Sequence, residues 1–150
     1  MSVANSATEE LTLDVLVVGG GPAGTAAALT LLRNTSLRIG LVERTGYAAW
    51  RIGETLPPSV PPLLEYLGVW ESQTAHAHLP AHGTSAVWGN PELTARSFLF
   101  SGRGHGWHLD RRRFDAELAE RVRDLDGRLF LSTTVREARW DGGWQVLLGH

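Results

Sequence analysis

Two short apolar runs near the start of the chain enclose a longer segment of different composition. The first run, LDVLVV, gives way to glycines after Val18, and the segment TAAALTLLRN that follows is dense in Ala and Leu as far as Asn34. The second run, LRIGLV, ends at Glu43. Apolar runs of this length are typical of buried strands, whereas the Ala- and Leu-rich segment favours a helix. The order strand, helix, strand predicts a βαβ unit with two parallel strands.

The pattern loses its period beyond the second strand. The stretch TGYAAWRIGETLPPSVPP is rich in Gly, Pro and Thr and predicts an ordered loop, which leads into a short helix over residues 61–68. Residues 71–83 are polar and irregular. The segments TSAVWG and RSFLF, at 84–89 and 96–100, predict two short strands joined through an Asn-Pro turn.

A stripe of apolar residues predicts a second long helix later in the chain. Its members are Phe114, Leu118, Val122 and Leu125. Asp110 can cap the start of this helix, and Gly127 can close its end. A strand over residues 128–132 follows, and the segments 137–140 and 144–148, which flank an Asp-Gly-Gly turn, predict a hairpin.

The first strand opens directly into the glycine-rich turn GGGPAG. A strand, a G-x-G-x-x-G turn and a helix together are typical of a site that binds the pyrophosphate of a dinucleotide at the helix N-terminus. Gly19 allows the tight turn, Gly21 lets the backbone approach the phosphates, and Gly24 lets the helix lie close to the sheet. Pro22 suits the first helical turn, because its missing N–H would have no partner inside the helix. The predicted cofactor-binding residues of this turn are Gly19, Gly20, Gly21, Pro22, Ala23 and Gly24.

An acid at the tip of the second strand supports the same interpretation. Glu43 lies 19 residues beyond Gly24, where a carboxylate can accept hydrogen bonds from the hydroxyls of an adenosine ribose. The same carboxylate repels a 2′-phosphate, so the site disfavours NADP. Strand, glycines, helix and acid thus agree on a dinucleotide site.

Composition narrows the class of protein further. The chain has 150 residues, 43% of them hydrophobic, and a net charge of −2, so it can bury a core and has no electrostatic preference for nucleic acid or an anionic membrane. It has no Cys, which excludes disulfides and thiolate metal sites, and no Lys, which excludes a Schiff-base lysine. The first residues lack the pattern of a signal peptide, and no apolar run reaches the ~18 residues of a membrane span. We expect a cytoplasmic protein without a membrane or nucleic-acid partner.

Two other groups of side chains have possible chemistry of their own. Glu54 is a candidate catalytic carboxylate or, equally, a structural acceptor of backbone N–H groups. His76, His78 and His82 stand close together in the sequence. Alternate His residues in a polar loop are usually solvated, so we predict no metal site there.

Three segments together resemble one family. GGGPAG with Glu43 and Arg44, then RIGETLPP, then GWHLDRRRFDAEL are similar to motifs of the FAD-dependent monooxygenase superfamily, and most of all to its halogenase-like branch. That branch includes the tryptophan halogenases and flavoproteins that mature quinone cofactors. The resemblance covers the chain from Leu11 onward. It implies an α/β fold, with a Rossmann-like FAD-binding βαβ core of the GR2 type and part of an inserted β-rich substrate domain.

The fold that this resemblance implies is incomplete. Residues 1–10 are predicted to be a disordered leader and residues 11–150 the N-terminal part of an FAD/NAD(P)-binding domain. Within it, about 75–108 is expected to contribute to the sheet of the substrate domain. The chain has too few candidate parallel strands for a complete doubly wound sheet of five or six strands. We therefore expect it to be the first part of a longer fold.

The resemblance also implies roles for individual residues. The positions that match cofactor contacts beyond the glycine turn are Glu43, Arg44, Arg51, Arg111 and Val135. Arg44 and Arg51 match positions near the nucleotide, and Arg111 matches an arginine on the flavin side of the cofactor. Val135 matches a position near the adenine that acts through its backbone. The segment 53–55, Gly-Glu-Thr, resembles the halogenase motif close to the isoalloxazine.

These observations predict an FAD-dependent oxidoreductase of the monooxygenase-like kind, in which reduced flavin and O₂ oxygenate an aromatic or amino-acid-derived substrate. Tryptophan halogenases carry a lysine about thirty residues after the Gly-Glu segment, where this chain has HGTSAVWG, so a halogenase is the less favoured alternative. Two further alternatives are an NAD-dependent dehydrogenase and a truncated, non-catalytic nucleotide-binding fragment. The expected electron donor is NAD(P)H. The expected partners are a small-molecule or amino-acid-type substrate and either a flavin reductase or a protein substrate.

Overall fold

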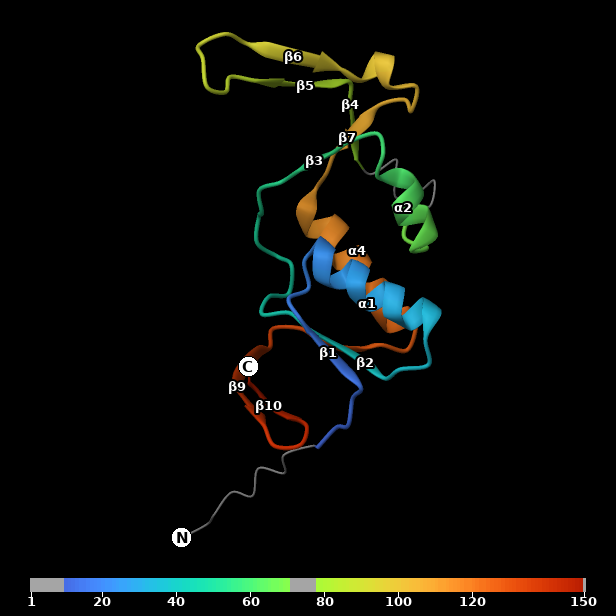
Figure 1. The fold of residues 1–150 in the computed structure, drawn as a ribbon, viewed down its shortest axis with the longest axis vertical. Coiled ribbons are helices and arrows are strands. Elements are labelled where there is room, and N and C mark those ends of the chain that lie inside the picture. Colours follow the sequence, from blue (N-terminus) through green and yellow to red (C-terminus); the bar gives the residue numbers. More distant parts are fainter. Residues whose placement is uncertain (1–9, 71–77, 150) are drawn as a thin grey trace.

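The centre of the fold is a three-stranded parallel sheet. A computed structural model describes residues 10–70 and 78–149, so His76 and all but the last residue of the predicted leader lie outside the described residues. The sheet has the order β1-β2-β8 and consists of β1 (Val15–Val18), β2 (Ile39–Val42) and β8 (Arg128–Phe130). Helix α1 (Pro22–Asn34) connects β1 to β2, so the predicted βαβ unit is confirmed (Figure 1).

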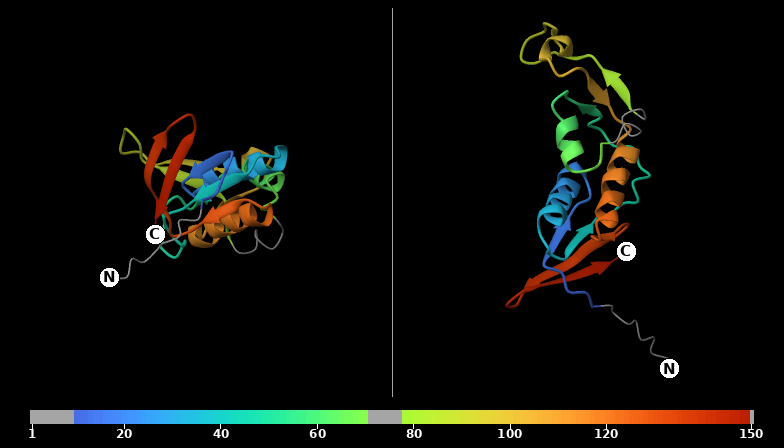
Figure 2. Two further views of the ribbon diagram at one scale, coloured as in Figure 1. Left: turned by 90° about the horizontal axis from the view of Figure 1, so that it is seen from below. Right: turned by 90° about the vertical axis from the view of Figure 1, so that its right-hand side faces the viewer.

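Two helices pack together over the sheet and form the core. Helix α4 (Arg111–Asp124) lies beside α1 (Figure 2). Leu29 of α1 and Leu118 and Val122 of α4 are at most 2% exposed and share one buried cluster with Leu41 of β2. The apolar stripe predicted for the second helix is thereby confirmed. Full burial of each such side chain stabilises the fold by about 2 kcal/mol, so this contact fixes α4 relative to the βαβ unit.

The two ends of α4 differ in how closely they follow the sequence prediction. The Asp110 side chain accepts the N–H of Arg112 at 3.0 Å and caps the helix as predicted. At the other end Asp126, with a φ of 63°, takes the left-handed position that the sequence assigns to Gly127. Gly127 is required for a different reason, because a Cβ there would lie only 2.6 Å from Cγ1 of Val122. The glycine therefore lets the chain pass close to the helix on its way into β8.

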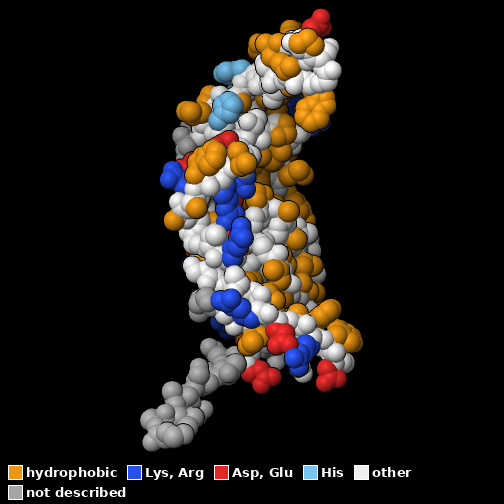
Figure 3. Space-filling model, turned by 90° about the vertical axis from the view of Figure 1, so that its left-hand side faces the viewer, with side chains coloured by type: hydrophobic (Ala, Val, Ile, Leu, Met, Phe, Trp, Pro, Cys, Tyr) orange, Lys and Arg blue, Asp and Glu red, His pale blue; other side chains and the backbone are white. Residues whose placement is uncertain are grey.

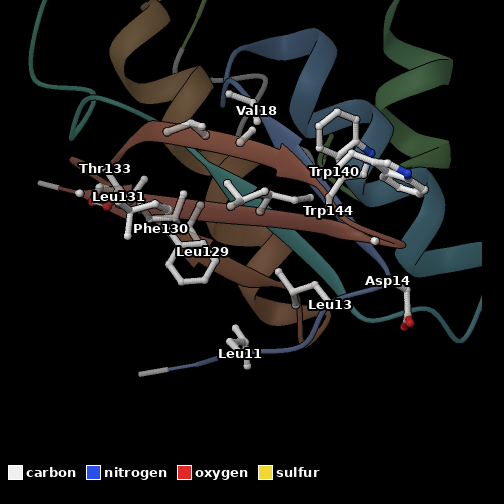
Figure 4. A pocket seen from close by; sticks show the side chains of 18 residues that line it. Leu11, Leu13, Asp14, Val18, Leu129, Phe130, Leu131, Thr133, Trp140 and Trp144 are labelled. Carbon is white, nitrogen blue, oxygen red and sulfur yellow. Dashed lines mark hydrogen bonds between the residues drawn. The ribbon is translucent and has the colours of Figure 1, made fainter. Parts of the chain in front are cut away.

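A hairpin and an open groove lie on the other side of the sheet. The predicted hairpin forms from β9 (Thr134–Trp140) and β10 (Trp144–Gly149). Between the hairpin and the sheet runs an apolar groove of about 1080 Å³, lined by Leu13, Val18 and Leu129 from the sheet side and by two tryptophans of the hairpin (Figure 4). This open side explains why β1 is only partly buried, whereas all four residues of β2 are buried.

The segment between β2 and α4 forms a separate β-rich part, seen at the top of Figure 1. Its small antiparallel sheet has the order β3-β7-β4 and consists of β3 (Thr55–Leu56), β7 (Gly106–His108) and β4 (Leu79–Ala81). The sequence pattern predicts none of these three strands, because each has at most three residues and pairs only with distant parts of the chain. The predicted short helix forms as α2 (Pro61–Tyr66).

A second hairpin projects from this part as an arm. It consists of β5 (Gly83–Ala86) and β6 (Thr94–Ser97), followed by the 3-10 turn η1 (Phe98–Ser101). The predicted strand at 96–100 was therefore wrong beyond Ser97, whose side chain accepts the N–H of Leu99 and starts the turn. Hydrophobic side chains gather on the arm (Figure 3), and Trp88 and Phe100 are each 92% exposed.

Candidate functional site

The three glycines of the G-x-G-x-x-G motif after β1 have different surroundings in the structure. Gly19 has a φ of 106°, in the left-handed region that favours glycine, and its N–H donates to the Val42 carbonyl at 2.7 Å. A Cβ on Gly24 would collide with the carbonyl oxygen of Gly19, so only glycine lets α1 pack this closely on the turn. Gly21 is different, because among the described residues, its two neighbours in the chain aside, no heavy atom lies within 4 Å of the position that its Cβ would take. The protein's own packing therefore does not require a glycine at Gly21.

Helix α1 begins at this open space without a side-chain cap. Gly21 is its N-cap residue, Pro22 lies at the start of the first turn, and the first turn carries no acidic residue. The backbone N–H groups of the turn and the positive end of the helix dipole therefore face a space that an anion can enter. This is the geometry that pyrophosphate binding by the predicted residues Gly19 to Gly24 requires.

Glu43 directs its carboxylate at the glycine turn. The residue is 4% exposed, and its Oε2 accepts the Gly20 N–H at 2.9 Å. Its Oε1 accepts the N–H and the hydroxyl of Thr45, at 3.0 and 2.6 Å, and Nη2 of Arg51 at 2.8 Å. Burial raises the pKa of Glu43, but the hydrogen bonds from Thr45, Gly20 and Arg51 outweigh it and bring the pKa below its ordinary value. The group is therefore ionised at neutral pH.

This arrangement gives Glu43 a structural task that its spacing in the sequence does not reveal. It ties the glycine turn to the end of β2 through the Gly20 N–H. A carboxylate oxygen accepts about two hydrogen bonds, and Oε2 has one donor among the described residues, so one acceptor site is left for a ribose hydroxyl. Holding the turn and holding a ribose are therefore compatible.

Tyr47 is a second buried contact of the glycine turn, and no pattern in the sequence predicts it. Its hydroxyl donates to the Gly20 carbonyl at 2.8 Å, and the residue is 4% exposed. Burial raises the pKa of Tyr47 well above its ordinary value, so the hydroxyl stays a neutral donor. A Cβ on Gly20 would collide with this hydroxyl. Gly20, which lies between the first two glycines of the motif, is therefore explained by the tyrosine that packs on it.

We expect Tyr47→Phe to lower the free energy of unfolding by about 1 to 2 kcal/mol, because the buried Gly20 carbonyl loses its donor. Urea denaturation measures the change. The matched control is Tyr66→Phe, since Tyr66 is 55% exposed and its hydroxyl bonds to Asn34 at the surface. That variant should lose less than about 0.5 kcal/mol. Equal losses in both variants would show that the buried contact does not stabilise the turn.

Arg51 and Arg111 come from different segments and meet at Asp115. Arg51 lies between two acids, with Nη2 at 2.8 Å from Glu43 and Nη1 at 3.5 Å from Asp115. Arg111 donates through Nε and Nη2 to the two oxygens of Asp115, each at 2.9 Å. Its Nη1 donates to the carbonyls of residues 52–53. The i, i+4 spacing of Arg111 and Asp115 indicates their ion pair, but nothing in the sequence indicates that Arg51 joins it.

The other candidate residues lie at the edges of this cluster. Arg44 is exposed just after β2. Val135 lies in β9 and lines the apolar groove, and Thr133, two residues before it, donates its N–H to the Glu43 carbonyl at 3.0 Å. Val135 therefore follows shortly after the residue that bonds to the backbone at the end of β2. Glu54 is partly buried, and its backbone carbonyl accepts the Leu109 N–H, a contact that holds the loop through its main chain.

Three histidines of the described residues contact other groups of the protein. His78 is 4% exposed and its Nδ1 lies 3.4 Å from the backbone N–H of Asp110, while the rings of His82 and His105 pack edge to face. Within residues 10–70 and 78–149, no group of three or more His, Cys, Asp or Glu side chains is placed to hold a metal ion.

Among the same residues, no helix is both long and apolar enough to span a bilayer.

A parallel strand pair joined through a helix, with a glycine turn at the start of that helix, is the architecture of an α/β protein of the Rossmann type. The family model described as tryptophan halogenase matches residues 14–92. LodB of Marinomonas mediterranea, named as an FAD-dependent oxidoreductase, is 32% identical over 139 residues, which are 91% of this chain and 38% of that protein. The tryptophan 2-halogenase of Chondromyces crocatus is 32% identical over 132 residues, which are 85% of this chain and 24% of that protein.

The chain belongs to the tryptophan halogenase family. Among solved structures, the myxobacterial chondrochloren halogenase CndH superposes with a TM-score of 0.71 and 26% identity, over 87% of this chain and 31% of that one. The chain spans 38% of the length of LodB and 24% of the length of the tryptophan 2-halogenase. The expectation of an incomplete Rossmann-type fold is therefore confirmed.

Proposed function

We propose that the chain forms the FAD-binding part of a flavin-dependent oxidoreductase. The observation that carries the proposal is the open space at Gly21, where bare backbone at an uncapped helix start lies beside an ionised carboxylate. Packing within the protein does not require this glycine, whereas a diphosphate that approaches the backbone does. The residues present therefore fit a dinucleotide. The names of the relatives, among them flavin-dependent halogenases, support FAD over NAD as its identity.

Each part of the site would hold a different part of the cofactor. The N–H groups of the glycine turn would donate to the pyrophosphate, and Glu43 would accept from the adenosine ribose. Arg111 uses four of its five N–H donors within the protein, two on Asp115 and two on the carbonyls of residues 52–53, and one is left for the cofactor. FAD supplies the redox chemistry when bound, while these residues supply position and charge.

For the reaction itself, we propose flavin-dependent halogenation of an aromatic substrate. The family match and several relatives named as halogenases support it over the monooxygenase-like reaction that the motifs predict. Oxygenation is the second candidate, because the chain has no Lys where tryptophan halogenases carry one. The names of relatives include a tryptophan halogenase and a chlorinase of a carrier-bound pyrrole, which supports a free or carrier-bound aromatic substrate.

We also propose that residues 78–108, which contain β4, β7 and the arm, contribute to the substrate-binding part of the protein. These residues stand apart from the parallel sheet (Figure 1) and present exposed aromatic side chains. NAD(P)H is the proposed source of electrons, either directly or through a separate flavin reductase. Flavin reduction by NADH with and without an added reductase distinguishes the two routes.

The intact protein should carry FAD after purification or take it up when FAD is added. The visible absorbance spectrum tests this, since a dehydrogenase of the NAD type shows no flavin bands. Protein that retains no flavin absorbance after unbound FAD has been removed, but binds NADH, would overturn the proposal. Incubation with reduced flavin, O₂, chloride and tryptophan as a probe then tests the reaction. Mass spectrometry distinguishes a hydrogen replaced by chlorine from a single added oxygen.

A further inference from the structure

Asp115 is a buried acid in the middle of the candidate site. Neither the glycine motif nor the position of Glu43 predicts that Asp115 belongs to this site. It has no exposed surface, although it lies in the second turn of α4. Both of its oxygens accept from Arg111 at 2.9 Å, and Oδ2 also lies 3.5 Å from Nη1 of Arg51. A buried carboxylate is costly unless it is paired, so its burial indicates a fixed position for both guanidinium groups.

Two chains of contacts run from Asp115 to different parts of the nucleotide site. The first passes through Arg51 to Glu43, which holds the N–H of the glycine turn. The second passes through Arg111 to the carbonyls of residues 52–53. This second contact is close, because a Cβ on Gly53 would lie 2.8 Å from Nη1 of Arg111. Asp115 thus joins the acid at the tip of β2 to the loop that follows Arg51.

We propose that Asp115 is a positioning residue of the nucleotide site, which it serves by holding Arg51 and Arg111. The inference rests on the proposed function, because it assumes that Glu43 binds a ribose. Two cations and two anions balance in this cluster while Asp115 is ionised. Without that charge Glu43 is the remaining acidic partner of Arg51, so the guanidinium can move fully onto its carboxylate. It would then occupy the acceptor site that the ribose needs, and Arg111 would no longer hold the 52–53 loop in place.

Asp115→Asn in the intact protein tests this role. The substitution keeps the volume and removes the charge, and we expect ADP and FAD each to bind about tenfold more weakly, the effect of displacing one charge-assisted hydrogen bond. Calorimetric titration with ADP and flavin fluorescence with FAD measure the two affinities. The matched control is Glu120→Gln, because Glu120 lies on the same helix, is half-exposed and pairs with Arg123. This control should bind both nucleotides as the wild type does.

A second comparison separates positioning from a general loss of stability. If Asp115 acts through Arg51, the losses of ADP affinity should not add. The double variant Asp115→Asn with Arg51→Gln should then bind ADP as well as the single variant that has the lower affinity. Asp115→Glu, which keeps the charge but moves it by one methylene, should lose less affinity than Asp115→Asn. If Asp115→Asn does not fold, folded Asp115→Glu must still bind ADP measurably more weakly than the wild type.

The outcomes distinguish this inference from the proposed function. Wild-type protein that binds ADP and FAD, together with folded Asp115 variants that bind them equally well, would overturn the role of Asp115 and leave the FAD site standing. Additive losses in the double variant would also overturn it. Wild-type protein that binds neither nucleotide would overturn both proposals.

Discussion

Gly21→Val should abolish FAD binding while leaving the protein folded. Apart from the adjoining residues, no heavy atom of the described part of the chain lies within 4 Å of the missing Cβ, so the valine side chain enters the space that the proposed pyrophosphate takes. Loss of two charge-assisted hydrogen bonds from the turn amounts to ~3 kcal/mol or more, which weakens affinity at least about a hundredfold. Valine is also a poor N-cap residue, which should lower stability by only about 1 kcal/mol. Flavin absorbance after purification and thermal unfolding by circular dichroism measure the two effects.

Gly143→Val is the matched control for this variant. Gly143 also has no heavy atom within 4 Å of its missing Cβ and no left-handed φ, but it lies between β9 and β10, away from the start of α1. This control should keep its FAD. A Gly21→Val protein that retains a normal flavin spectrum would refute the assignment of the pyrophosphate to the glycine turn.

The parts of the fold that the sequence predicts well are those built from neighbouring residues. The βαβ unit has a continuous apolar strand, an Ala-rich helix and glycines at the junction, and each signal lies within a few residues of the structure that it specifies. The stripe of Phe114, Leu118 and Val122 likewise needs only the helical period. The cap at Asp110 follows from its own side chain and the next two residues.

The small sheet and the arm are harder to predict from the sequence, because their strands form by pairing with residues that are distant in the chain. Thr55 pairs with His108, and Leu79 pairs with the same histidine, across separations that no local pattern encodes. The segment RSFLF has strand composition throughout, yet Ser97 accepts the N–H of Leu99 and turns the chain into a 3-10 turn. A short side-chain contact to the backbone overrides β propensity there.

The candidate site shows the same division between local and distant signals. Gly19, Gly24 and Glu43 could be predicted because a known spacing relates them, and the structure brings them together around one turn. Tyr47 and Asp115 could not, because their roles depend on burial and on partners from other segments. A tyrosine four residues after an acid and an aspartate four residues after an arginine are common patterns that carry no such meaning alone.

Gly24→Ala should unfold or strongly destabilise the protein, the opposite outcome to a substitution at Gly21. The new Cβ would collide with the carbonyl oxygen of Gly19, which is main chain and cannot move aside as a side chain can. Gly19 is itself fixed by its left-handed φ and by the hydrogen bond from its N–H to Val42, so α1 must shift away from the turn. We expect a loss of about 3 kcal/mol in the free energy of unfolding, at the upper end of the usual cost of overpacking.

Gly21→Ala is the matched control, since it adds the same methyl group three residues earlier at a position with free space. Urea denaturation without FAD should place Gly21→Ala within about 1 kcal/mol of the wild type and Gly24→Ala well below it. Gly24→Ala that is as stable as Gly21→Ala would mean that α1 does not pack on the Gly19 carbonyl. The helix N-terminus would then lie farther from the turn than the phosphate site requires. Because these measurements need no cofactor, they test the geometry of the turn separately from the identity of the nucleotide.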